Sequence, residues 1–125
     1  DYLFIDTHPG LNEETLLSIS ISDILIIIMR PDQQDFQGTI VTVDLAKMLL
    51  VDNLYLMVNK VLSKYDFNQI KEEIEGVFDV EVAAVLPLSE ELVDLASSDL
   101  ISLTLPEHPW SLGITSVAKM IMETN

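Results

Sequence analysis

Apolar and polar residues are distributed along the chain in two kinds of segment. Four short runs are almost wholly apolar and rich in Ile, Leu and Val: YLFI at 2–5, ILIIIM at 24–29, LYLMVN at 54–59 and VEVAAVLPL at 80–88. Because these runs lack the regular polar alternation of a half-exposed strand, they predict parallel strands that are covered on both faces.

The stretches between the runs have the spacing of amphipathic helices. They predict helices over 12–21, 38–50, 66–76, 89–96 and 112–123. Asn12, Asp66 and Ser89 are good N-cap residues, and Gly76 is a good helix terminator. Alternating strands and helices predict a doubly wound, mostly parallel α/β sheet with flanking helices and at least four strands. In such a sheet, ligands bind beyond the carboxyl ends of the strands.

The chain has the length and composition of one folded domain. It has 125 residues, of which 49% are hydrophobic and 22% charged, so a single α/β domain over 1–125 is expected. It contains no cysteine, which excludes a disulfide framework and a thiolate metal site. The longest apolar run is too short to cross a bilayer, and the first residues do not resemble a signal peptide. We therefore expect a soluble, cytoplasmic protein with no membrane segment.

Acidic residues greatly outnumber basic ones. The formal net charge is −15, from 21 Asp and Glu against 6 Lys and Arg, and the basic residues are scattered. Such a surface repels phosphate backbones and anionic lipids, so no nucleic-acid contact is expected.

Polar residues with possible chemistry lie at the end of each apolar run, at 6–10, 29–32, 59–60 and 87–89. The first run ends in Asp6, followed by Thr7, His8, Pro9 and Gly10. A carboxylate at a strand end suits an outer-shell Mg²⁺ ligand beside nucleotide phosphates, and a glycine lets backbone N–H groups approach a phosphate oxygen. The other interpretation is that Asp6 and Thr7 cap a turn that Pro9 and Gly10 shape.

Several of these segments resemble a known family when they are taken in order. LFIDTHPGLNEETL resembles the Walker B and switch II segment of the MinD/ParA family of deviant Walker P-loop ATPases. ILIIIMRPDQQDFQGT resembles the next strand and helix, LYLMVNKV the strand whose final asparagine reads adenine, and VAAVLPLSEEL the strand and proline loop that close over the base. The resemblance extends over essentially all 125 residues.

The glycine-rich phosphate loop of that family does not occur in this sequence. The four glycines are far apart and no GK[ST] motif is present. The resemblance therefore implies the C-terminal part of a MinD/ParA-like ATPase domain, beginning just before the Walker B strand, in which ATP and Mg²⁺ would be bound by the complete domain.

The resemblance also implies roles for individual residues. Asp6 would hold Mg²⁺ through water, Gly10 would sense the γ-phosphate, Asn59 would hydrogen-bond adenine, and Pro87 would offer its backbone to the base. Asp32 lies where the family has an acidic residue near the nucleotide and the dimer partner. His8 stands where the family usually has Pro or Ala.

Two other functions stay open at this level. An Asp at a strand end followed by Pro and Gly is also found in the phospho-acceptor segment of receiver domains, with Asp6 as acceptor and Lys60 as the later lysine. A non-catalytic interaction module that kept only the sheet is the third interpretation. For a half domain we expect exposed strand edges, and hence a homodimer or association with the missing N-terminal half through residues 2–6 and 12–21.

Overall fold

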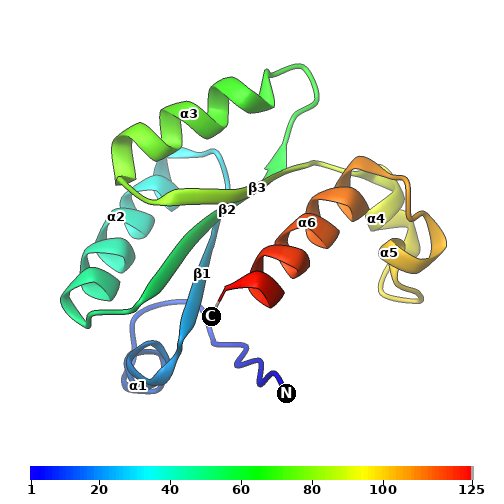
Figure 1. Ribbon diagram of the computed structural model, residues 1–125. Coiled ribbons are helices and arrows are strands. Elements are labelled where there is room, and N and C mark those ends of the chain that lie inside the picture. The colour runs from blue at the N-terminus through cyan, green and yellow to red at the C-terminus, as the bar shows by residue number, and fades with distance from the viewer. Residues whose placement is uncertain (125) are drawn as a thin grey trace.

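The computed structural model describes residues 1–124, and its strands form one parallel sheet in the order β1-β2-β3. In chain order the elements are α1 (Glu13–Ile21), β1 (Ile24–Met29), α2 (Gln33–Met48), β2 (Asn53–Val61), α3 (Phe67–Phe78), β3 (Glu81–Pro87), α4 (Glu90–Leu95), α5 (Ile101–Thr104) and α6 (Pro109–Glu123). Figure 1 shows the sheet between helices. The predicted α/β class with a parallel sheet and flanking helices is confirmed.

Helices cover both faces of the sheet. Apolar residues of α2 and α3 pack with β1, β2 and β3 in the larger core, which includes Val43, Leu56 and Phe78. Residues of α6 pack on the other face in a second core around Met57, Leu86 and Val117. This arrangement follows from the connections, because two crossovers of the same hand between successive neighbouring strands place α2 and α3 on the same face.

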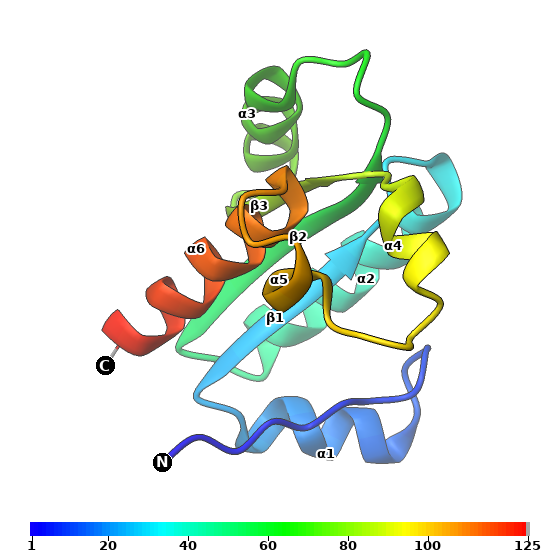
Figure 2. The same ribbon diagram turned by 90° about the vertical axis from the view of Figure 1, so that its right-hand side faces the viewer.

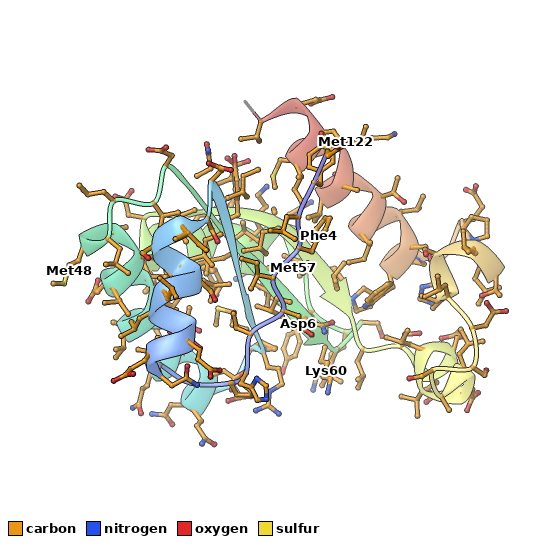
Figure 3. The ribbon with its side chains drawn as sticks, turned by 90° about the horizontal axis from the view of Figure 1, so that it is seen from below. Phe4, Asp6, Met48, Met57, Lys60 and Met122 are labelled. Atoms are coloured by element: carbon orange, nitrogen blue, oxygen red, sulfur yellow. The ribbon has the colours of Figure 1, made fainter. Side chains whose placement is uncertain are left out.

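The sequence predicted one strand too many. Residues 2–5 form no strand, and their side chains are largely exposed, with Leu3 87% and Phe4 78% accessible. Figure 3 shows Phe4 and Asp6 on the N-terminal trace, which passes the sheet without joining it. An apolar run becomes a strand only when a neighbouring strand completes its backbone hydrogen bonds. Within residues 1–124 no strand pairs with residues 2–5, so the prediction of at least four strands is wrong for the described chain.

Strand β1 is also less covered than its sequence predicted. Its outer edge has no partner strand among the described residues, and Ile28 is 60% exposed. Figures 1 and 2 show α1 at the end of the molecule nearest to β1. Strands β2 and β3 contain the fully buried Leu56, Val58 and Val82, as expected for strands covered on both faces.

Three helices begin at the capping residues that the sequence predicted. Asn12, Asp66 and Ser89 each accept hydrogen bonds from the first turn of their helix, as predicted. Helix α3 continues past Gly76 to Phe78 and is capped by Asp79, which takes the left-handed conformation with φ +51°. Gly76 was therefore wrongly predicted as the terminator.

Two helices begin earlier than their apolar spacing predicted. Helix α2 begins at Gln33, because the Asp32 carboxylate accepts a hydrogen bond from the Asp35 N–H at 3.0 Å. Helix α6 begins at Pro109, because Nδ1 of His108 accepts from the Trp110 N–H at 3.1 Å. In both cases a polar cap, rather than an apolar residue, sets the start of the helix.

Candidate functional site

The carboxyl ends of the three strands lie together at one edge of the sheet. Met29 pairs with Val58, and Val58 pairs with Val85, so the three strands reach this edge in register. The segments at this edge are 30–32 after β1, 59–61 at the end of β2, and 87–89 at and just after the end of β3. The structure thus brings three of the four polar segments predicted from the sequence to one place.

Asn59 and Lys60 form a bulge at the end of β2. From Val58 to Val61 this strand advances three residues while β3 advances two, from Val85 to Pro87. Lys60 takes up the extra residue in the left-handed conformation, with φ +59°. The Asn59 side chain supports this turn, because its Oδ1 accepts a hydrogen bond from the Lys60 N–H at 2.8 Å. Bulges of this kind redirect side chains and are frequent beside functional sites.

Pro87 lies directly beside this bulge. It pairs with Val61 in the sheet, and the Leu88 N–H donates to the Val61 carbonyl at 2.8 Å. A shallow cavity of about 250 Å³ begins here and is lined by Leu88, Ser89, Glu90, Val93 and Asp94. Asn59 and the residues after Pro87 therefore lie close together at the ends of two hydrogen-bonded strands.

A small hydrogen-bond network holds the segment after Pro87. The Ser89 hydroxyl accepts from the Leu92 N–H at 3.1 Å and donates to Oε2 of Glu91 at 2.9 Å. The same Glu91 oxygen lies 3.5 Å from Nε2 of His108 at the start of α6. Backbone and Ser89 hydrogen bonds to the carboxylate, together with the nearby His108, hold the pKa of Glu91 below its usual value. The sequence predicted the Ser89 cap, but it gave no signal for the contact with His108, which is distant along the chain.

The Asp32 carboxylate makes two contacts within the protein. Besides capping α2, it lies 3.3 Å from Nε of Arg30. The Arg30 guanidinium also makes two hydrogen bonds to Asp35, at 3.0 and 3.1 Å, and the Arg30 N–H makes a third at 2.9 Å. Hydrogen bonds from the side chain and backbone of Arg30 lower the pKa of Asp35. This cluster fixes the turn from β1 into α2, and sequence reasoning missed it because Arg30 and Asp35 are five residues apart and do not share a regular element.

Asp6, His8 and Gly10 lie on the exposed N-terminal segment. Gly10 has φ +98°, a conformation that favours glycine, and Asn12 two residues later caps α1. Among residues 1–124, no hydrogen bond or ion pair joins Asp6 to Arg30, Asn59 or Lys60. The structure therefore does not connect this predicted site segment to the other three through any polar contact.

The described residues contain neither a cluster of metal ligands nor a helix that could span a membrane. Within residues 1–124, no three His, Asp or Glu side chains are grouped closely enough to hold a metal ion. Over the same residues, no helix has the length and apolar character needed to cross a bilayer.

Comparison with known proteins identifies relatives of about twice this length. No family profile matches the chain. It is 25% identical over 123 residues to an uncharacterized ATP-binding protein of Methanocaldococcus jannaschii, and this match covers 98% of the chain and 46% of that protein. The chain thus spans about half the length of its curated relative.

Two of the solved structures that match this chain are proteins of Aquifex aeolicus. The MinD cell division protein matches with a TM-score of 0.74 and 18% identity, over 93% of this chain and 50% of that one. A chain of the MinC:MinD cell division protein complex matches with a TM-score of 0.78 and 19% identity, over 93% and 49%. The fold is therefore MinD-like, and the resemblance to the MinD/ParA proteins that the sequence indicated is confirmed over this length.

Proposed function

We propose that this chain carries the base-recognition and switch segments of a MinD/ParA-like ATP-dependent switch protein. The observation that carries the proposal is the placement of Asn59 and Pro87 on neighbouring strands, joined by the hydrogen bond from Leu88 to Val61. The ATP-binding relative and the MinD-like fold support the same conclusion.

The chemistry of these two residues suits adenine. Since Oδ1 of Asn59 already accepts from Lys60, the Nδ2 amide is the group left to donate to a ring nitrogen of the base. Proline has no N–H, so Pro87 offers only its carbonyl, which accepts from an exocyclic amine. Adenine presents both an acceptor ring nitrogen and an amine along one edge, whereas guanine has a carbonyl at the corresponding position. Leu88, 49% exposed in the adjoining cavity, supplies apolar surface for the face of the ring.

The phosphate and metal roles rest on the sequence resemblance. Under the proposal Asp6 is an outer-shell Mg²⁺ ligand, Gly10 senses the γ-phosphate, and Asp32 lies near the nucleotide and a dimer partner. Within residues 1–124 no three His, Asp or Glu side chains converge on one metal site, and the sequence has no GK[ST] loop for a triphosphate. We infer that the phosphates are bound by groups outside these 125 residues.

The proposed biological action is that of a nucleotide switch. ATP would promote dimerisation and thereby partner binding, and hydrolysis would reset the protein. One of the matching structures is a complex of MinD with MinC, which supports a fold that recruits partner proteins. A receiver-like role for Asp6 is less well supported, because the chain matches a MinD structure and an ATP-binding protein over almost its whole length.

Base selectivity tests the proposal. The isotopically labelled chain is titrated with adenosine and with guanosine while amide signals are followed by NMR. Adenosine is expected to shift the signals of Asn59, Lys60 and Leu88, and guanosine to shift them much less. The Asn59→Ala variant should lose the response, whereas Asn68→Ala, an exposed asparagine on α3, should keep it. Equal responses to the two nucleosides, or a full response in Asn59→Ala, would contradict base recognition at this edge.

A further inference from the structure

We propose that α4, α5 and the start of α6 form a docking surface for a basic amphipathic helix of a partner protein. Five apolar side chains in this region are between 42% and 73% exposed: Val93, Leu100, Leu103, Leu105 and Leu112. Figure 1 shows α4 and α5 grouped near the start of α6, apart from the main body formed by the sheet with α2 and α3. We refer to these five side chains and the carboxylates around them as the leucine–acid surface.

The number of exposed apolar residues here is larger than solubility favours. Single exposed leucines are common on protein surfaces, but a group of them on adjoining elements usually marks an interaction site. The contacts between α4 and α5 and between α5 and α6 hold these elements together. Ile101 and Ser111 are buried between them, and the Ser111 hydroxyl donates to the Ile101 carbonyl at 3.2 Å. The exposed leucines are therefore carried by an ordered support.

Charge determines which partner this surface fits. The exposed carboxylates of Glu90, Asp94, Asp99 and Glu107 lie among the apolar residues along the chain. Residues 72–118 contain no Lys or Arg, in a chain whose formal charge is −15. A second copy of the chain would bring like charges together, whereas a helix with Lys or Arg beside its apolar stripe would meet opposite charges. Helices of this kind bind apolar grooves through residues spaced at i, i+3, i+4 and i+7.

The test uses a defined probe and matched variants. A fluorescent peptide of about 15 residues, with a leucine stripe flanked by lysines, is titrated with the protein at low and high salt while anisotropy is measured. Its controls are a scrambled peptide of the same composition and a peptide with glutamates in place of the lysines. We expect the amphipathic basic peptide to bind, and to bind at least about fivefold more weakly to Val93→Gln and to Leu103→Gln. Asp94→Asn should reduce the salt dependence of its binding.

Control variants separate this surface from general attraction to an acidic protein. Leu17→Gln on α1 removes a leucine that is 63% exposed, close to the 69% of Val93 and the 73% of Leu103, and Asp44→Asn on α2 removes an exposed acid. Both should bind the peptide as the unchanged chain does. The proposal is overturned if the scrambled peptide binds equally, if Leu17→Gln weakens binding as much as Leu103→Gln, or if no binding is seen. It is also overturned if Leu103→Gln abolishes self-association in sedimentation, because the surface would then be occupied by a second copy.

Discussion

The bulge at the end of β2 holds a lysine in a conformation that suits glycine, and replacing Lys60 by glycine should therefore stabilise the fold. Lys60 has φ +59°, and the left-handed conformation costs an L-residue about 1–2 kcal/mol. Glycine avoids this cost but loses about 0.5–1 kcal/mol more backbone entropy on folding. The Lys60 side chain is exposed and makes no described hydrogen bond or ion pair, so its loss costs little. The free energy of unfolding of Lys60→Gly should therefore rise by about 0.5–1 kcal/mol, and its Tm by about 2–4 °C.

The measurement is urea unfolding of the 125-residue chain, followed by circular dichroism. Lys60→Ala is the control, because alanine removes the charge and the long side chain but keeps the unfavourable conformation. Its free energy of unfolding should stay within about 0.5 kcal/mol of that of the unchanged chain. If Lys60→Gly is no more stable than Lys60→Ala, the bulge does not store backbone strain, and this argument for a specialised strand end fails.

Three further predictions concern the core, the charged turn and the exposed edge. Leu86 is 1% exposed in the second core, so Leu86→Ala should lower the free energy of unfolding by about 2–5 kcal/mol. Val93→Ala on the surface should change it by less than about 0.5 kcal/mol, and equal effects of the two variants in urea unfolding would contradict the position of the core. Hydrogen bonds from Arg30 lower the pKa of Asp35 from its usual value of about 3.8, so the ionised carboxylate stabilises the fold above that pH and loses this contribution as the pH falls through the lowered pKa. Arg30→Met should therefore make the urea midpoint less sensitive to pH below about 4, and an unchanged pH profile would contradict the ion pair. The edge of β1 has no partner strand among the described residues, and residues 2–5 are exposed, so the chain should self-associate at moderate salt. Ile28→Lys should reduce this association, whereas the control Met48→Lys on α2 should not. Sedimentation that shows only monomer at every salt and protein concentration would refute the prediction.

The parts of the fold that the sequence predicted well are those governed by local patterns. The apolar runs that became β1, β2 and β3 each lie next to a helix whose stripe covers them, so local pattern and tertiary packing agree. The run at 2–5 has the same pattern but no neighbouring strand, and pairing between strands is not encoded in a single segment. The sequence therefore predicts which segments are able to form strands, but not which of them find partners.

The candidate site also contains some features that the sequence predicts and others that it does not. Asn59 and Pro87 were predicted at strand ends, and the parallel register brings them together. The left-handed Lys60 and the contact of Glu91 with His108 could not be predicted, because each depends on three-dimensional neighbours rather than on spacing along the chain. Asp32 was predicted at a strand end and given its role by the resemblance, and the structure adds its capping of α2 and its ion pair with Arg30.

The most direct test of the central proposal compares adenosine with Mg-ATP on this chain. If these residues recognise the base and not the phosphates, both ligands should shift the same amides around Asn59 and Leu88. Their affinities should be similar and in the millimolar range, because a few hydrogen bonds of about 1 kcal/mol each supply the binding energy. Calorimetry with Mg-ATP should then be nearly silent. Micromolar binding of Mg-ATP, about 100-fold or more tighter than that of adenosine, would show that a phosphate site lies within these 125 residues. If neither ligand shifts the amide signals, the proposal that this edge of the sheet recognises the base is wrong.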